Sequence, residues 1–369
     1  MKPIRTTTPV TSLTALFFIF LCGIGMVSAA EPESMRQWQL DKAESGAGYA
    51  PVLKTVPVPV PAANEVLVRM RAVSLNRKDI YAQDRSLETG QATPGLSISD
   101  GAGDVAAVGA DVTRFKIGDR VVPAFDTEWV DGAASGYKAR TGLLSEYALV
   151  SEATLLPIPD YLSYEEAATL PCAGVTAWNT LFKAAKLQKD EYVLLEGTGG
   201  VSIFGLQLAA AAGGRPIITS SSDEKLGKAQ ALGAFGTVNY RTNPDWDINV
   251  RKITNDVGVK HVLEVGGQDT FPKAVRSLAK GGHIGSIGGL GEGGFVREAP
   301  VDLLKPYDAT WSYIYVGSRA DLEALNAFMT EHQIKPVIDR VYPFAQAMAA
   351  YDYMRNGSFF GKIVITVDK

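Results

Sequence analysis

The pattern of apolar positions along the chain changes near residue 160. Before it, short apolar or alternating segments at 66–73, 105–108 and 120–122 follow one another without a helical period between them. Strands spaced in this way predict a compact β-rich domain. After it, apolar segments of strand length alternate with helical ones, at 192–196, 216–220, 236–239, 260–265, 282–287 and 311–316. This alternation predicts a doubly wound α/β domain with a mostly parallel sheet.

Two local signals mark the junctions between these regions. Ser163-Tyr-Glu-Glu166 is a capping box, which predicts that a helix begins there. Near the carboxyl end the pattern predicts a helix around 344–355 and a strand over 362–367, which we assign back to the β-rich domain. The expected division is therefore 35–160 for the β-rich domain, 161–315 for the α/β domain and 316–369 for the return to the first.

Residues 1–30 have the pattern of a secretory signal peptide. Lys2 and Arg5 precede an apolar run over 13–27, and small residues at 28–30 are suited to cleavage. The run is shorter than the roughly 20 residues that span a bilayer, so we expect cleavage and export to the periplasm or the outside. An uncleaved anchor is one alternative, and translation from Met35, giving a cytoplasmic protein, is another. No later segment has the pattern of a membrane helix, so no membrane partner is expected for the mature form.

Charge and cysteine content narrow the classes of function. The formal net charge of -4 argues against nucleic acid as a partner. Cys22 lies in the predicted signal, so the mature chain keeps only Cys172 and has no intrachain disulfide. The histidines lie too far apart in sequence for a shared local metal motif, and we expect no metal ligands; they are His261, His283 and His332.

The segment 192–205 predicts a dinucleotide-binding turn between an apolar strand and a helix. Gly197-Thr198 would form the tight turn, while Gly199, Gly200 and Val201 would bring the backbone close to a pyrophosphate at the start of the helix. Ser202 stands where a third glycine usually packs the helix on the strand, and Gly205 is expected to supply that close approach. The alternative is a tight turn in an unrelated α/β domain.

The end of the second α/β strand favours NADP(H) over NAD(H). Ser220 and Ser222 offer hydroxyl donors and Lys225 a positive charge for a 2'-phosphate, where an acidic residue would favour the free ribose hydroxyl. Asp223 is counter-evidence, although it is expected to serve as the N-cap of the next helix. Tyr240 is expected to close over the adenosine side together with Arg241. The alternative makes Lys225 and Arg241 ordinary solvated charges.

Two further glycine pairs end strands at the carboxyl edge of the predicted sheet, where ligands bind in open α/β folds. They are Gly266-Gly267 and Gly288-Gly289, the second preceded by Ile287. Backbone without side chains is expected to leave room there for a flat ring.

Several motifs together resemble the medium-chain dehydrogenase/reductase superfamily, in its zinc-free, quinone-oxidoreductase-like and zinc-type alcohol dehydrogenase-like branch. They are Ser-Leu-Asn-Arg-Lys-Asp at 74–79, Asp-Gly-Ala-Gly-Asp-Val at 100–105, Phe-Lys-Ile-Gly-Asp-Arg-Val-Val at 115–122, Glu-Ala-Ala-Thr-Leu-Pro at 166–171, Gly-Val-Thr-Ala-Trp at 174–178 and Gly-Lys-Ile-Val-Ile at 361–365. The resemblance implies a GroES-like catalytic domain, a Rossmann domain, a cofactor between them and commonly a homodimer. It also implies that Asn76 and Thr176 lie near the nicotinamide, 199–201 at the pyrophosphate, and Ser222, Lys225 and Tyr240 at the 2'-phosphate.

The chain departs from the zinc-dependent members of that superfamily. Those members carry a cysteine near Asn76, a His-Glu pair near 99–100 and a four-cysteine lobe where this chain has 124–142, and all of these are absent. Without a Lewis acid, hydride addition to an enone or quinone becomes the favoured chemistry, because a conjugated system spreads the developing charge. Asn76, Lys78 and Tyr81 are the polar catalytic candidates, and each is alternatively a helix-surface or capping residue. Asp79 is expected to be structural and Cys172 to be core.

These observations predict an NADP(H)-dependent, zinc-independent oxidoreductase that transfers hydride to small enones or quinones. The alternatives are an NAD(P)-dependent alcohol dehydrogenase or aldehyde reductase on the same scaffold, and a noncatalytic NADP(H)-binding protein. The loops at 124–142 and 291–307 are expected to shape the substrate pocket.

Overall fold

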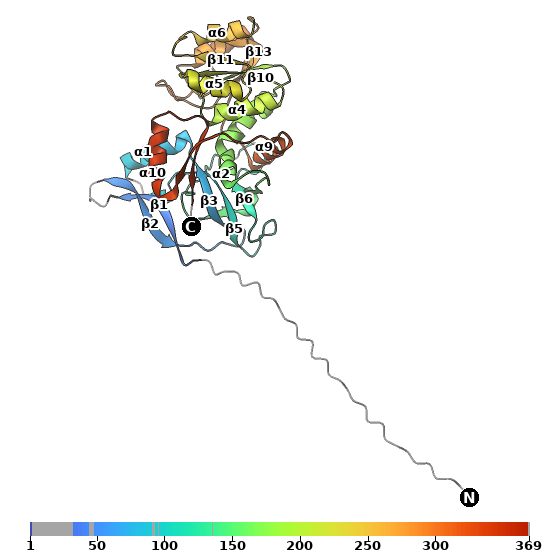
Figure 1. Cartoon of the computed structure of the whole chain (residues 1–369). Helices are drawn as coiled ribbons and strands as arrows, with labels where there is room; N and C mark the ends of the chain where they lie inside the picture. The colour runs from blue at the N-terminus through green and yellow to red at the C-terminus, as the bar shows by residue number, and fades with distance from the viewer. Residues whose placement is uncertain (2–31, 44–47, 91–92, 95, 135, 368–369) are drawn as a thin grey trace. The chain divides into compact units, whose positions relative to one another are not determined.

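The computed structural model describes Met1 and residues 32–43, 48–90, 93–94, 96–134 and 136–367 (Figure 1). Its contacts divide the chain into Met1–Pro32 and Glu33–Lys369. Apart from Met1, the predicted signal peptide lies outside the described residues. Among the residues that are described, no helix has the length and apolarity needed to cross a membrane.

The first half of the chain, together with two strands from its carboxyl-terminal part, forms two mostly antiparallel sheets. The smaller has the order β2-β1-β4, with β1 Ser34–Lys42, β2 Tyr49–Pro57 and β4 Thr93–Pro94. The larger has the order β15-β16-β3-β5-β6-β8, with β7 also on β3. Its strands are β3 Glu65–Ser74, β5 Asp100–Val108, β6 Arg120–Pro123, β7 Tyr147–Ser151, β8 Leu155–Pro157, β15 Ile338–Pro343 and β16 Lys362–Thr366. The antiparallel pairing of β16 with β3 confirms that the carboxyl-terminal strand returns to the first sheet.

Helix α1 (Arg77–Thr89) interrupts these strands, which the strand spacing did not predict. Asn76 is its N-cap and forms a capping box with Asp79, so the capping alternative for Asn76 is confirmed. The helix ends at Gly90, whose left-handed backbone makes it a C-cap. Figure 1 shows α10 (Ala347–Arg355) beside α1, where Arg355 Nη2 donates to Gln83 Oε1 at 2.9 Å.

The second sheet is parallel throughout, with the order β11-β10-β9-β12-β13-β14. This is the doubly wound order that the sequence predicted. Its strands are β9 Tyr192–Leu195, β10 Arg215–Ser220, β11 Gly236–Asn239, β12 Val259–Glu264, β13 Leu278–Ser286 and β14 Thr310–Tyr313. Its flanking helices are α4 Gly200–Ala211, α5 Asp223–Ala231, α6 Trp246–Ile253, α7 Phe271–Arg276 and α8 Val301–Leu304.

Alternation within a strand supplies the two faces of this sheet. Val193 and Leu195 pack with residues of α4 and α5 in one core cluster, whereas Leu194 packs with residues of α6 and α7 in another. Successive side chains of a strand point to opposite faces, so a strand covered on both sides is apolar throughout.

A helical segment joins the two sheets. It begins at Ser163, whose capping box with Glu166 is confirmed, and continues as α2 Tyr164–Ala167 and α3 Val175–Trp178. Two stretches of π-helix, Leu170–Gly174 and Asn179–Ala184, lie within it. Short 3₁₀ turns occur elsewhere at Glu152–Thr154, Lys305–Tyr307 and Phe344–Gln346, and α9 spans Arg319–Glu331.

Gly205 provides the close approach of α4 to the sheet that its position predicted. A Cβ added there would lie 2.8 Å from Leu263 Cδ2 and 2.9 Å from Leu195 Cδ2. Ser202, at the usual third glycine position, is buried, and its hydroxyl donates to the Glu196 carbonyl at 2.6 Å. The helix is therefore tied to the strand end by a hydrogen bond and seated on the sheet at Gly205.

Replacement of Gly205 by valine is expected to lower the free energy of unfolding by about 1–3 kcal/mol, because the added methyl groups overpack the sheet. Gly227→Val in α5 is the matched control, since no atom lies within 4 Å of a Cβ at that position. Urea unfolding of both variants checks this prediction. Equal losses at the two sites would contradict it.

Candidate active site

The predicted phosphate turn lies between β9 and α4. Gly197 has φ 70°, a left-handed conformation that favours glycine, and its N–H donates to Thr219 Oγ1 at 3.1 Å. Gly199 is the N-cap of α4 and offers no side-chain hydrogen bond to the helix. A Cβ on Gly199 would have only Phe359 near it, at 3.9 Å. The first N–H groups of a twelve-residue helix are thus left for an anion, as a pyrophosphate site requires.

Gly200 has a packing role in addition to the pyrophosphate contact that its motif predicts, and that contact stays a prediction. A Cβ there would lie 2.6 Å from Lys362 Cδ and 3.2 Å from Ala173 Cβ. The space that a side chain at 200 would take is therefore occupied by Lys362 and Ala173. Beside it, the Gly361 N–H donates to the Thr198 carbonyl at 3.0 Å, so the turn rests on the carboxyl-terminal segment of the first sheet.

The serines after β10 lie where the sequence placed them. Ser220 is buried at the strand end, and its carbonyl accepts from the Tyr240 N–H at 3.0 Å. Ser222, rather than Asp223, is the N-cap of α5, and its Oγ accepts from the Lys225 N–H at 3.4 Å. The expectation that Asp223 caps the helix is wrong. Asp223 instead accepts a hydrogen bond from Asn239 Nδ2 at 2.7 Å.

Lys225 is partly buried, and its ammonium donates to the Gly357 carbonyl at 3.3 Å. Burial lowers its pKa, and Asp339 opposes that shift. Tyr240 keeps an exposed ring, and Arg241 is exposed. Lys225 is therefore held near the end of β10. Arg241 instead fits the alternative in which it is an ordinary solvated charge.

The glycine pairs at the ends of β12 and β13 are also accounted for by packing. A Cβ on Gly267 would lie 2.0 Å from the Gly294 carbonyl oxygen, and one on Gly288 would lie 2.4 Å from that of Val265. On Gly266 it would meet Thr270 Oγ1 at 2.2 Å. The absence of side chains at these positions is therefore required by packing within the chain, and space for a flat ring beside them stays a prediction. Contact of a cofactor with 266–267 or with Ile287 and Gly288 stays a prediction.

Two buried glutamates organise this edge of the sheet, and the sequence reasoning missed them. Glu196 Oε2 accepts from the Val265 and Gly266 N–H groups at 3.2 and 3.3 Å, and Glu264 Oε1 accepts from the Gly267 N–H at 2.7 Å. Burial raises the pKa of Glu196 well above its usual range, and the charge of Glu264 raises it further. Burial likewise raises the pKa of Glu264. Their sequence signal is an acidic residue at the carboxyl end of an apolar strand.

Asn76 and Lys78 come together with residues from three other segments in a buried polar cluster. Its other members are Asp79 of α1, Asp100 of β5, Cys172 of the joining helix and Lys362 of β16. Burial raises the pKa of Asp100, against the opposing charge of Lys362. Cys172 is partly buried, its N–H donates to Asp100 Oδ2 at 3.1 Å, and burial raises the pKa of its thiol. These shifts make Cys172 a poor nucleophile, consistent with the expected core role.

The three predicted catalytic residues differ in their surroundings. Asn76 is 9% exposed, and its Oδ1 accepts from Lys362 Nζ at 2.7 Å. Lys78 donates to Asp79 Oδ1 at 2.8 Å and to the Ser97 carbonyl at 3.0 Å, and its ammonium lies 5.2 Å from the Phe125 ring centre. Tyr81 is 46% exposed on α1. Asn76 and Lys78 therefore belong to the polar cluster, whereas Tyr81 lies on the helix surface. Thr176, a predicted neighbour of the nicotinamide, is buried in α3.

The loop at 124–142 is held by hydrogen bonds and aromatic contacts. Asp126 accepts from the Glu128, Trp129 and Lys138 N–H groups at 2.9, 3.0 and 2.7 Å. Arg140 is buried and donates to the Ala124 carbonyl at 3.0 Å. Burial lowers the pKa of Arg140 to about 10, with Asp126 opposing the shift.

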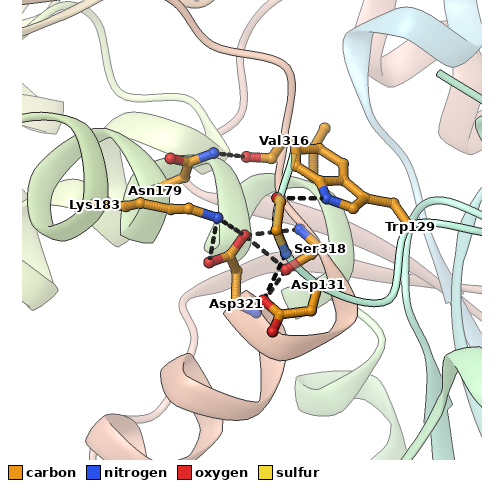
Figure 2. Close-up of polar contacts among 8 residues, drawn as sticks. Trp129, Asp131, Asn179, Lys183, Val316, Ser318 and Asp321 are labelled. Atoms are coloured by element: carbon orange, nitrogen blue, oxygen red, sulfur yellow. Dashed lines mark hydrogen bonds and ion pairs between the residues drawn. The ribbon is translucent and has the colours of Figure 1, made fainter. Parts of the chain in front are cut away.

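The same loop docks on the start of α9. The Trp129 and Val130 carbonyls each accept from an N–H of its first turn, at Arg319 and Ala320, both at 2.9 Å. Figure 2 shows Lys183 and Ser318 converging on the Asp321 carboxylate, with Lys183 Nζ 2.9 Å from Asp321 Oδ2. The loop thus satisfies helix N–H groups that have no partner within the helix.

Comparisons with known proteins agree with this architecture. The family described as zinc-binding dehydrogenase matches residues 200–331, and the alcohol dehydrogenase GroES-like domain matches residues 62–160. A zinc-type alcohol dehydrogenase-like protein of Schizosaccharomyces pombe is 40% identical over 315 residues, covering 82% of this chain and 91% of the relative. The chain belongs to the medium-chain dehydrogenase/reductase superfamily.

Two further members of the superfamily show how its names vary. The quinone oxidoreductase of Mus musculus is 28% identical, covering 82% of this chain and 91% of its own. A solved structure from Sinorhizobium meliloti 1021, assigned as an alcohol dehydrogenase, has a TM-score of 0.82 at 37% identity and covers 92% of this chain and 100% of its own. The protein is therefore an oxidoreductase of the medium-chain dehydrogenase/reductase type, and the noncatalytic alternative is set aside.

Zinc-dependent members of the superfamily hold the metal in a cluster of cysteine, histidine and acidic ligands. In the part of this chain that the structure describes, no group of three or more such residues is arranged to hold a metal ion. The polar cluster contains Asn76 and Lys362, and an ammonium group cannot ligate a cation. Zinc independence stays a prediction.

The glutamate pair predicts a pH dependence of stability. The usual pKa of a glutamate is 4.5, and the pKa of Glu196 in the folded protein is higher. At a pH between these two values the unfolded chain releases a proton that the folded protein keeps. The free energy of unfolding therefore falls as pH rises through this range. Glu196→Gln removes one of the two ionisations and is expected to flatten this fall. Thermal unfolding from pH 5 to pH 9 measures it, with Glu292→Gln on an exposed loop as the control. The idea fails if the Tm of Glu196→Gln declines with pH as steeply as that of the parent.

Proposed function

We propose that the protein is an NADPH-dependent, zinc-independent reductase of small conjugated carbonyl compounds, enones or quinones. The observation that carries this proposal is the polar cluster beside the phosphate turn. It contains two ammonium groups and an Asn76 Nδ2 that completes no hydrogen bond among the described residues, although Asp100 lies close to it. Donors and positive charge held in a buried site stabilise an oxygen that gains negative charge.

The cofactor preference rests on the tip of β10. Ser222 uses its oxygen as an acceptor for the Lys225 N–H, so its hydroxyl hydrogen is available to donate. The carboxylate of the next residue, Asp223, accepts a hydrogen bond from Asn239. A hydroxyl donor and a nearby ammonium are the groups that favour a 2'-phosphate, which supports NADP(H) over NAD(H).

The residues of the site have different roles in the proposed reaction. When bound, the reduced nicotinamide supplies the hydride. Asn76 Nδ2 would donate a hydrogen bond to the carbonyl oxygen of the acceptor. Burial alone would lower the pKa of Lys78, but Asp79 reverses the effect and raises it, so Lys78 stays charged at neutral pH. Lys78 therefore stabilises charge rather than donating a proton, and water would complete the protonation.

Aromatic side chains near Lys78 favour a planar acceptor. Phe125 meets Tyr315 edge to face with ring centres 5.7 Å apart, and Tyr137 lies 3.9 Å from Tyr315. Burial raises the pKa of Tyr315 to about 12, so its hydroxyl stays protonated and can donate. Such rings offer a flat apolar wall for a conjugated substrate.

The purified protein is expected to oxidise NADPH in the presence of enones or quinones, and a chelator is expected to leave the rate unchanged. Loss of NADPH absorbance with a panel of enones, quinones and aldehydes measures this. Chelator-sensitive turnover, or turnover with aldehydes alone, would instead favour alcohol dehydrogenase chemistry, which the 40% identical alcohol dehydrogenase-like relative makes the second candidate.

Removing the proposed phosphate contacts is expected to weaken NADPH binding far more than NADH binding. The variant is Ser222→Gly with Lys225→Met, in which glycine preserves most of the helix cap. Each charge-assisted contact is expected to contribute about 1.5–3 kcal/mol, so the Kd for NADPH should rise at least 10-fold. Lys228→Met is the control, because Lys228 pairs with Glu224 in the same helix. Equal losses for the two nucleotides would refute the phosphate assignment.

We further propose that residues 1–30 direct export and that the mature enzyme is a homodimer. The basic residues, apolar run and small residues at the amino end support export. Amino-terminal sequencing of the native protein is expected to begin at Glu31, and its solution mass to be that of a dimer. A native chain that begins at Met1 or Met35 would exclude cleavage after residue 30.

A further inference from the structure

Lys362 is a buried lysine, with only 3% of the residue exposed. It donates to the Leu75 carbonyl and to Asn76 Oδ1, both at 2.7 Å. A buried ammonium is retained only where carbonyls and opposite charges replace its water. One of the oxygens that replace water around Lys362 belongs to Asn76, the residue that the proposed function places against the substrate.

Charged or titratable groups from three other segments act on Lys362. Asp79 and Lys78 lie on α1, Asp100 on β5, and Cys172 on the joining helix. Burial lowers the pKa of Lys362, Asp100 and Asp79 oppose that shift, and Lys78 adds to it. Asp100 and Asp79 are thus the carboxylates whose charges favour the ammonium form of Lys362.

The contact between Lys362 and Asn76, together with the capping box at the start of α1, determines which way the Asn76 amide points. An ammonium group has donors and no acceptor, so it can face only the oxygen of a carboxamide. With Oδ1 held by Lys362, Nδ2 must occupy the other side, near Asp100, and there it completes no hydrogen bond among the described residues. A buried donor left open in this way is available to a bound molecule.

The stem of Lys362 reaches the phosphate turn. Its Cδ lies 2.6 Å from where a Cβ of Gly200 would be, and the preceding Gly361 donates to the Thr198 carbonyl at 3.0 Å. The middle of the Lys362 side chain therefore lies against Gly200, the first residue of α4. Its ammonium group contacts Asn76, which carries the candidate donor.

We propose that Lys362 is a positioning residue, which holds Asn76 Oδ1 so that Nδ2 is presented to the carbonyl oxygen of the acceptor, and which ties this orientation to the phosphate turn. The proposal rests on the proposed function. Lys362 itself does not touch the substrate. Loss of its ammonium would leave the Asn76 amide free to turn and present its oxygen, which repels a developing negative charge.

The first test is a double-mutant cycle with Lys362→Met and Asn76→Ala. Each single variant is expected to lower kcat about 10- to 100-fold, with the Kd for NADPH changed less than about 3-fold. Because Lys362 acts through Asn76, the double variant should be no slower than Asn76→Ala alone. Multiplied losses would overturn the proposal, since they would show that the two residues act separately. Lys335→Met, at an exposed pair with Glu166, is the control for loss of a lysine.

The second test does not need turnover. In protein labelled with ¹⁵N-asparagine, the Asn76 side-chain signal is the one lost in Asn76→Ala. Lys362→Met is expected to shift this signal, and Lys335→Met is expected to leave it in place. An unchanged signal in Lys362→Met overturns the proposal even if the parent enzyme reduces quinones. A shifted signal in an enzyme without turnover instead contradicts the proposed function alone.

A third variant covers the case in which Lys362→Met does not fold. Asn76→Asp keeps the acceptor for Lys362 but has no Nδ2, so it should fold, bind NADPH and lose kcat as Asn76→Ala does. Full kcat in Asn76→Asp would show that no donor at this position is needed, and would overturn the proposal.

Discussion

The contact between the phosphate turn and the carboxyl-terminal strand is the constraint on which the rest of the site depends. Gly361 pairs with Gly199, its N–H bonds to the Thr198 carbonyl, and the Lys362 stem occupies the place of a side chain at 200. A residue larger than glycine at 200 would have to displace the Lys362 stem. The glycine in the motif therefore allows the meeting of the sheets, besides its predicted contact with the cofactor.

The protein handles buried charge in two different ways on the two sides of this contact. In the polar cluster, Lys78 and Lys362 lie among Asp79 and Asp100, and these opposite charges counteract the effect of burial on the lysine pKa values. At the edge of the parallel sheet, burial raises the pKa values of Glu196 and Glu264, and the charge of Glu264 adds to the rise for Glu196. Unlike charges oppose the effect of burial at the first site, whereas like charges add to it at the second.

The described part of the loop at 124–142 is shaped by hydrogen bonds to two buried charged residues. The Asp126 carboxylate gathers N–H groups from both ends of the loop, and Arg140 fixes its base to Ala124 and Thr154. The middle of the loop caps α9 through the Trp129 and Val130 carbonyls. Each contact satisfies a polar group that folding removes from water, which is why the described part of the loop keeps a defined shape.

The sequence by itself determined the elements whose signals are local. The period of apolar residues located the six parallel strands, the Ser163 capping box placed the start of the joining helix, and Gly197 marked the phosphate turn. Helix α1 was missed, although Asn76, Asp79 and Gly90 carry its start and stop signals, because the neighbouring strands dominated the pattern. Only the tertiary structure decided that Lys362 meets Asn76 across 286 positions, that Glu196 lies beside Glu264, and that Gly200 faces a lysine stem. Periodicity reports which face of an element is buried, but it carries no information about which distant residue lies against that face.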